Sequence, residues 1–267
     1  MANGDVQYFK ATLYFDSEPG ISAESLTEAW GAEGYECELV NDKGVFDGLR
    51  GATRVFVGTP EPVTARLAPA HYPAVAQADV DWSSLFCVDA KAAYDDLRQA
   101  THQCEFGFFI IADEDNPEIA HNEIASTLLG IHQVAPMRAV VLHYLDMIVG
   151  RANLDDYLNY ANSHLDQPQQ MAAMLAFGAF VTEEGEAITA WTTGLSRFGQ
   201  TDLLYEMKAG DATQALLTIF GLAHLVVSGR RRFAAGEAIT SLDLLARLEP
   251  AKLHGQPMLR VVRHGAE

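Results

Sequence analysis

The sequence lacks the short motifs that mark common catalytic sites. A Gly-x-Ser-x-Gly nucleophile elbow, a glycine-rich phosphate-binding loop and a His-Glu-x-x-His metal helix are all missing from its 267 residues. These absences remove the enzyme classes that such motifs identify. Function must therefore be inferred from charge, from the remaining candidate residues and from resemblance to known proteins.

Cysteine and long apolar runs are also scarce. Three cysteines, Cys37, Cys87 and Cys104, stand at wide and irregular spacing, which argues against a disulfide framework and is typical of a reducing compartment. The apolar runs are too short or too interrupted to cross a bilayer of about 30 Å. The first fifteen residues lack the pattern of a secretory signal. We therefore expect a cytoplasmic protein with no membrane partner.

Basic residues are outnumbered two to one. The chain has 18 Lys and Arg against 36 Asp and Glu, a formal charge of −18 at pH 7. Nucleic acids bind through Lys and Arg, so this charge argues against a nucleic-acid partner. It favours a basic protein partner, and solubility alone is the alternative explanation. Residues 230–267 reverse the trend, with seven basic and four acidic residues.

The order of predicted elements indicates an α+β protein. Gln7–Phe15 is expected to be a strand, Ser22–Ala32 a helix opened by Ser22, and Cys104–Ala112 a central apolar strand. Asp115-Asn116-Pro117-Glu118 is a strong start for a helix that runs to about Gln133. Leu259–Arg263 is expected to form a last edge strand.

Hairpins complete the predicted fold. Thr53–Gly58 and Val63–Ala68 are expected to pair, Met137–Leu145 to form a buried strand, and Glu183-Glu184-Gly185 to join two further strands. Strands joined by hairpins and helices predict a mainly antiparallel sheet with helices packed on one face. The pattern allows two ferredoxin-like halves, residues 1–100 and 101–267, within one compact unit.

Four stretches resemble a bacterial family of unknown activity, domain of unknown function 4261. The stretches are Val63–Pro73, His102–Ala112, Thr192-Thr193-Gly194-Leu195 with Phe198-Gly199 and Asp202, and the helix Leu216–Ser228 with the turn at Gly236. They occur in the family's order over about residues 50–240. Ala234-Ala235-Gly236-Glu237 departs from the more acidic turn expected there. The resemblance implies a fold and a bacterial origin, but no reaction.

Two groups of residues are candidates for binding a partner. Arg197 and Phe198 lie in a short loop bracketed by Gly194 and Gly199, and Arg and aromatic side chains often anchor interfaces. Turn geometry alone would also account for the two glycines. Glu183 and Glu184 add carboxylates at the predicted hairpin tip.

The histidines are candidates for an enzyme site. His102 and His143 could serve as general bases, although a buried, hydrogen-bonded core residue is the alternative for His143. His121 and His132 lie about 16 Å apart along the predicted helix, too far for a shared metal. His102 with Cys104 lacks a second ligand pair. We expect neither a metal nor a cofactor.

Three hypotheses remain open. The first is a cytoplasmic bacterial protein that binds a basic protein, in its concrete form an immunity-type protein neutralising a basic toxin or effector. The second is a hydrolase-like enzyme with an unrecognised site of histidines and carboxylates. The third is a structural subunit that self-associates into a homo-oligomer through an exposed sheet edge.

Overall fold

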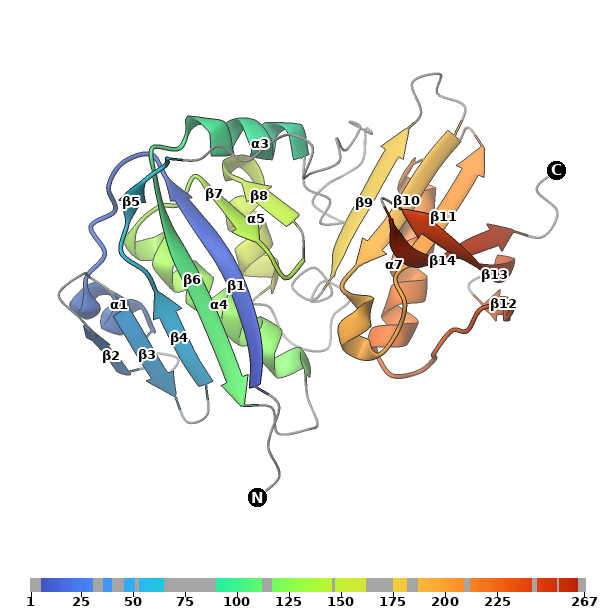
Figure 1. Ribbon diagram of the computed structural model, residues 1–267, viewed down its shortest axis with the longest axis horizontal. Coiled ribbons are helices and arrows are strands. Elements are labelled where there is room, and N and C mark those ends of the chain that lie inside the picture. Colours follow the sequence, from blue (N-terminus) through green and yellow to red (C-terminus); the bar gives the residue numbers. More distant parts are fainter. Residues whose placement is uncertain are drawn as a thin grey trace. The chain divides into compact units, whose positions relative to one another are not determined.

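The chain forms two compact units in a computed structural model (Figure 1). One unit comprises Met1–Pro73 and Val88–Ala173, and the other comprises Ala74–Cys87 and Met174–Glu267. The structure describes residues 6–30, 36–39, 46–50, 53–64, 90–111, 117–145, 147–161, 175–181, 187–208, 212–241, 244–253 and 255–263. Each unit is built around its own sheet.

The first unit contains an eight-stranded antiparallel sheet in the order β2-β3-β4-β6-β1-β7-β8, with β5 also paired to β6. Its strands are β1 (Val6–Phe15), β2 (Glu36–Leu39), β3 (Phe46–Arg50), β4 (Thr53–Val57), β5 (Glu61–Pro62), β6 (His102–Ile111), β7 (Ala139–Leu142) and β8 (Met147–Gly150). Its helices are α1 (Ala23–Trp30), α3 (Ala90–Gln99), α4 (Pro117–Val134) and α5 (Arg151–Ala161).

The second unit contains a six-stranded sheet in the order β12-β13-β14-β11-β10-β9. Its strands are β9 (Ala176–Val181), β10 (Ala187–Thr193), β11 (Leu203–Lys208), β12 (Ala238–Ser241), β13 (Leu244–Leu253) and β14 (Gln256–Arg263). The 3₁₀ helix η4 (Leu195–Phe198) follows β10, and α7 (Ala212–Val227) packs near β9, β10 and β11. Only β11 and β14 pair in parallel among the described strands.

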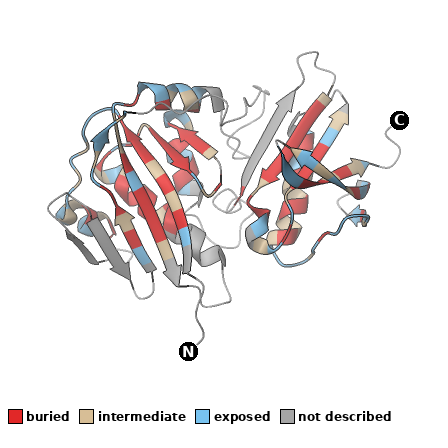
Figure 2. Cartoon of the chain, in the orientation of Figure 1, coloured by how far each residue is buried: buried red, intermediate tan, exposed pale blue. Residues whose placement is uncertain are grey.

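Side-chain alternation divides the first sheet into two faces. On one face, Leu13 of β1 lies between Cys104 of β6 and Val140 of β7, and all three are buried. Helices α4 and α5 lie behind the sheet in Figure 1, and red marks the buried strand positions in Figure 2. Helix α1 packs against α4 in the same layer. This layer of helices covers the main core.

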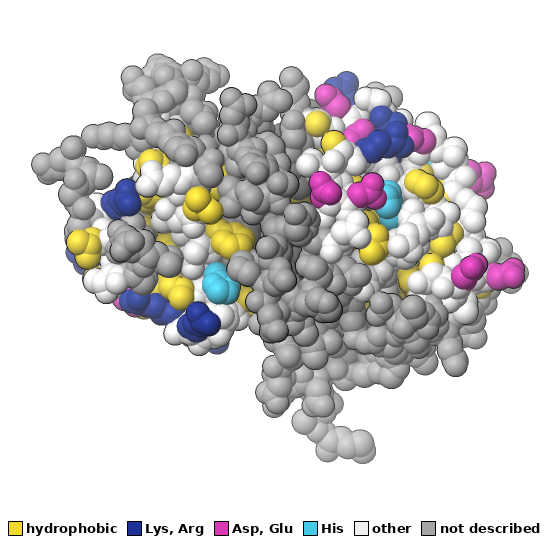
Figure 3. Space-filling view, turned by 180° about the vertical axis from the view of Figure 1, so that it is seen from behind, with side chains coloured by type: hydrophobic (Ala, Val, Ile, Leu, Met, Phe, Trp, Pro, Cys, Tyr) yellow, Lys and Arg dark blue, Asp and Glu magenta, His cyan; other side chains and the backbone are white. Residues whose placement is uncertain are grey.

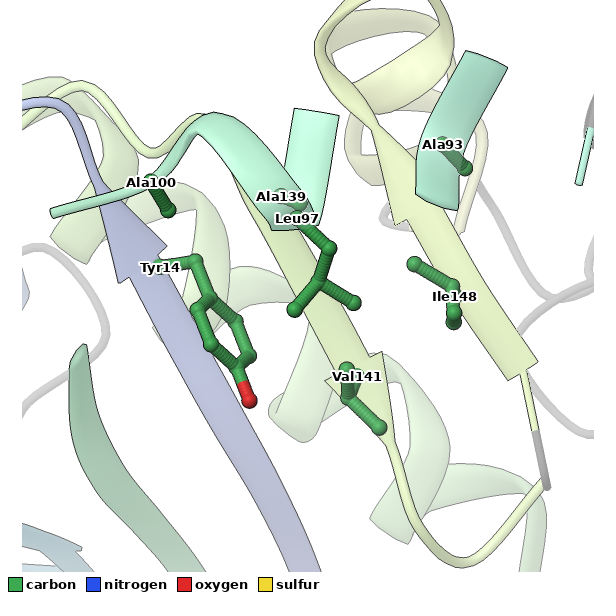
Figure 4. Close-up of a cluster of buried hydrophobic side chains, with 7 residues drawn as sticks. All are labelled: Tyr14, Ala93, Leu97, Ala100, Ala139, Val141 and Ile148. Carbon is green, nitrogen blue, oxygen red and sulfur yellow. The ribbon is translucent and has the colours of Figure 1, made fainter. Parts of the chain in front are cut away.

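Helix α3 packs on the opposite face, at the β7–β8 end. Its Leu97 contacts a buried cluster that includes Tyr14, Val141 and Ile148 (Figure 4). Thr12 and Tyr14 face Val141 and Ala139 across β1 and β7, which fixes this side of the sheet. The unit therefore has helices on both faces, but only α3 on the second face among the described helices.

The α+β class and the mainly antiparallel sheets confirm the prediction. The first unit departs from the predicted packing of helices on one face, because α3 packs on the second face of its sheet. The chain divides differently from the predicted halves 1–100 and 101–267, because β6 pairs with β1 and belongs to the first unit. Neither sheet has the four strands of a ferredoxin-like half.

Two predicted strand arrangements were wrong. β4 and β5 both pair with β6, one after the other, so the described part of the predicted Thr53–Ala68 hairpin does not pair with itself. β14, which includes the predicted edge strand Leu259–Arg263, is an interior strand between β13 and β11.

Candidate functional site

The loop predicted to bind a partner is a tightly bonded turn between β10 and β11. Gly194 and Gly199 bracket η4 with positive φ angles of 112° and 65°, a region where glycine avoids a Cβ clash. The Asp202 carboxylate accepts hydrogen bonds from Thr192 Oγ1 at 2.9 Å and from the Leu195 and Gly194 amides at 3.0 and 3.3 Å. The predicted turn role of both glycines is therefore confirmed.

A second set of bonds joins this turn to the segment after α7. Gln200, with 5% of its surface exposed, donates from Nε2 to the Phe233 carbonyl at 3.0 Å. Its Oε1 accepts from the Phe233 amide at 2.8 Å. Arg232 donates to the Gly199 carbonyl at 3.1 Å. Together, these contacts explain the Thr-Gly-Leu, Phe-Gly and Asp pattern as a set of residues that stabilises the turn.

The structure leaves the predicted partner-binding roles in this region as predictions. Phe198 is half-buried in η4. The backbone of Arg197 belongs to η4, but its side chain lies outside the described residues, as do Glu183 and Glu184. Strands β9 and β10 do pair antiparallel on either side of that predicted hairpin tip.

The structure does not bring His102 and His143 together. His102 lies opposite Phe15, whose side chain belongs to the face covered by α1, α4 and α5. The His143 Nε2 atom lies 2.8 Å from Thr12 Oγ1, on the other face of the same sheet. A joint site of the two imidazoles would require them to reach through the sheet. The hydrolase hypothesis gains no support from this arrangement.

Each histidine has a local hydrogen-bonding role. His143 lies in the turn after β7 and is exposed, so the interpretation of it as a buried core residue was wrong. β7 ends at Leu142 rather than continuing to Leu145. Thr101 donates from its hydroxyl to the Asp16 carbonyl, which leaves the His102 Nδ1–H to donate to Thr101 Oγ1 at 3.0 Å.

The Cys104 thiol is unsuited to nucleophilic chemistry. It is buried in β6, and burial raises its pKa to about 12, so the thiol stays protonated near neutral pH. Among the residues that the structure describes, no group of three His, Cys, Asp or Glu side chains is placed to hold a metal ion.

His132 links the end of α4 to α5. Its Nδ1 accepts from the Met137 amide at 2.9 Å, and its Nε2 lies 3.0 Å from Asp155 Oδ1. Both bonds form when the neutral ring carries its proton on Nε2. The fourth candidate histidine, His121, also lies on α4, but its side chain is outside the described residues.

A network of charged groups holds the ends of four elements in the first unit. Asp16, just after β1, forms ion pairs with Arg138 and Arg151. Arg138 also contacts Asp96 of α3 at 3.3 Å and donates to Gln99 at 2.6 Å. The hydrogen bond from Arg138, with help from Arg151, holds the pKa of the Asp16 carboxyl below its usual range. This network is structural.

The helices α1, α4 and α5 form a surface that we call the acidic layer. Their sequences contain six Asp and Glu and a single basic residue, Arg151, which is paired with Asp16. Glu24 and Glu28 of α1 and Asp155 and Asp156 of α5 are exposed. No described Lys or Arg forms an ion pair with any of these four carboxylates.

Packing between the helices brings these carboxylates into one layer. Trp30, fully buried, donates from Nε1 to the Thr127 carbonyl of α4 at 2.9 Å and so fixes α1 against α4. The bond between His132 and Asp155 fixes α4 against α5. In Figure 3, Asp and Glu side chains are spread over the described part of this face, at the right of the view.

The negative charge of the chain is concentrated in the first unit. That unit has 24 Asp and Glu against 9 Lys and Arg, a charge of −15, and the second unit carries the remaining −3. The acidity can be read from the sequence, but its location cannot, because the pairing of β6 with β1 assigns residues beyond 100 to the first unit. The acidic layer is therefore the candidate binding surface that could not be located from the sequence.

No family model, curated protein or solved structure matches this chain. The resemblance to the family of unknown function therefore stays a prediction. In the part of the chain that the structure describes, none of the helices combines the length and the apolar character needed to cross a membrane.

Proposed function

We propose that this protein binds a basic protein partner through the acidic layer of its first unit. The observation that carries the proposal is the set of exposed carboxylates Glu24, Glu28 and Asp156, which have no basic partner among the described residues. Carboxylates left unpaired on a packed helical surface attract Lys and Arg of an approaching protein. The helices that carry them are already packed against one another, so binding needs little further ordering of the backbone.

The concrete form of the proposal is an immunity-type protein of the bacterial cytoplasm that neutralises a basic toxin or effector. The net charge of −18 and the lack of catalytic motifs support this form. The buried, protonated Cys104 thiol is compatible with a reducing compartment. The hydrolase alternative has less support, because His102 and His143 lie on opposite faces of the sheet.

The test begins with co-expression of the protein and the product of the gene next to its own, followed by co-purification of the pair. The affinity of the purified pair is then measured for the double variant Glu24→Gln/Glu28→Gln, which removes two charges from the acidic layer. The matched control is Glu61→Gln/Asp95→Asn, which removes the same charge from β5 and α3, outside this layer.

We expect the acidic-layer variant to lower affinity about ten-fold at low salt, since each exposed charge contributes up to about 1 kcal/mol. The control should change affinity much less, and added salt should weaken binding by the unmodified protein. Equal effects of the two variants would contradict the proposal. So would a chain that binds no product of a neighbouring gene.

A further inference from the structure

The central part of the first sheet has a second face that no described helix covers. Tyr8 of β1 has 51% of its surface exposed and stacks on Phe109 of β6, with ring centroids 4.5 Å apart. Gly107 lies beneath this pair: a Cβ there would come within 3.0 Å of the Tyr8 ring. Phe56 of β4 lies opposite Gly107 in the register and is half-buried. We call these four residues the aromatic platform.

The surroundings of the aromatic platform are close to neutral. Lys10 Nζ contacts Glu105 Oε1 at 2.5 Å, and this pairing raises the pKa of Lys10. Glu61 of β5 lies opposite Gln103, farther along β6, and accepts a hydrogen bond from Gln103 Nε2 at 3.1 Å. Arg54 is also exposed on β4, opposite Phe109. A basic partner finds no unpaired cluster of carboxylates here, so this face differs in kind from the acidic layer.

We propose that the aromatic platform is the surface through which two copies of this chain associate. Two molecules of charge −18 repel each other, and the repulsion is strongest between acidic surfaces. They can meet only where the local charge is balanced and apolar area is available to bury. The aromatic platform meets both conditions within a unit of charge −15.

The chemistry of this face is also self-complementary. In a dimer with a two-fold axis perpendicular to the interface normal, each copy contributes the same patch to the interface. Tyr8 of one copy then packs against the aromatic platform of the other, and the adjacent Lys10 and Glu105 offer both signs of charge to their counterparts. Exposed aromatic groups with a polar surround are typical of protein interfaces.

Salt provides a signature that separates this proposal from binding of the basic partner. Screening weakens attraction between opposite charges, so the partner complex loosens as salt rises. The same screening relieves repulsion between two acidic copies, so self-association tightens. The two proposals can therefore succeed or fail independently.

Sedimentation equilibrium of the unmodified chain, at several protein concentrations and at low and high salt, tests self-association directly. We expect a monomer–dimer equilibrium whose association constant rises with salt. Tyr8→Glu should reduce that constant by about ten-fold or more, because it places like charges at the contact. The matched control is Leu217→Glu, which adds the same charge at an α7 side chain that is 53% exposed.

Circular dichroism and thermal unfolding establish that both variants are folded. If Tyr8→Glu lost its fold, Lys10→Glu would replace it, because this change puts two carboxylates side by side on the same face without altering the aromatic stack. A monomer at every concentration and salt level would overturn the proposal. So would a dimer that the platform variants and Leu217→Glu weaken equally.

Discussion

At the scale of single residues, Asp202 holds the η4 turn in place. Its carboxylate accepts hydrogen bonds from one hydroxyl, that of Thr192, and from two backbone amides. The same Thr192 hydroxyl oxygen accepts from the Leu203 amide at 2.9 Å, so it also holds the start of β11. Amides in a part-buried turn need partners, because an unsatisfied buried donor is costly. One carboxylate therefore fixes both ends of the loop between β10 and β11.

Replacing Asp202 should destabilise the second unit. Asp202→Ala removes all three hydrogen bonds and should lower the free energy of unfolding by about 1–3 kcal/mol. Asp202→Asn keeps one acceptor oxygen and should cost less. Equilibrium urea denaturation of the two variants measures the difference. Equal stability of Asp202→Ala and the unmodified chain would show that the turn does not depend on this carboxylate.

Asp16 should make the first unit sensitive to acid. Its folded pKa lies below the ordinary value of 3.8, chiefly because of the hydrogen bond from Arg138. A lowered folded pKa contributes stability that is fully present above the unfolded pKa and is lost as pH falls through the folded one. The unmodified chain should therefore exceed Asp16→Asn in stability at pH 7, and the gap should close below about pH 4.

Thermal unfolding of both proteins from pH 7 to pH 2 measures this gap. Asp95→Asn is the control, because Asp95 is exposed on α3 and makes no ion pair with a described residue. A stability gap that does not change with pH would mean that the Asp16 ion pairs contribute nothing through ionisation.

Some residue roles could be predicted from sequence. Gly194 and Gly199 were identified as turn glycines because glycine accepts positive φ at little cost. The separation of His102 and His143 could not be predicted. It depends on which face of the sheet each position occupies, and a one-residue change of register moves a side chain to the other face.

At the scale of elements, the joint between α1 and α4 positions the acidic layer. The Trp30 indole lies against α4 at Gly130, where a Cβ would stand only 2.6 Å from the Trp30 Cδ1 atom. Ser22 opens α1 by accepting from the Ser25 amide at 3.1 Å, as the sequence predicted. Glycine in a helix interior is unfavourable, so Gly130 is explained by this close approach.

Gly130→Ala should destabilise the protein although alanine favours helices. The helical gain of about 1 kcal/mol should be exceeded by an overpacking cost of about 1–3 kcal/mol. Denaturant unfolding of Gly130→Ala, Trp30→Phe and the double variant forms a thermodynamic cycle. The smaller phenyl ring of Trp30→Phe should relieve the clash with the Cβ that Gly130→Ala adds. The double variant should therefore be less destabilised than the sum of the two single changes.

The control for this cycle is Gly20→Ala, because nothing lies within 4 Å of a Cβ at Gly20. Additive effects of Trp30→Phe and Gly130→Ala would contradict the proposed contact. A stabilised Gly130→Ala variant would do the same.

Elements with strong local patterns were predicted well. The helix from Pro117 and the central strand at Cys104 were confirmed as α4 and β6. Strand β13 was missed because Pro250 interrupts its pattern, although proline can occupy a strand position that donates no ladder bond. β3 was missed because Gly48 and flanking charges weaken its alternation.

At the scale of the whole molecule, charge is divided unequally between the two units. The first carries −15 and the second −3. This division could not be predicted, because β6 joins the first unit by pairing with β1 from nearly 90 residues earlier in the chain. The acidic layer likewise depends on three helices from separate parts of the sequence. Composition predicts that a partner would be basic, and the fold gives the surface that we propose it binds.

Amide hydrogen exchange on the complex with the neighbouring gene's product tests the central claim most directly. Exchange rates are compared between the free chain and the complex, helix by helix and strand by strand. We predict slowed exchange in α1, α4 and α5, with little change in β10, β11 and α7 of the second unit. Slowed exchange confined to the second unit, with the three helices of the acidic layer unchanged, would contradict the account.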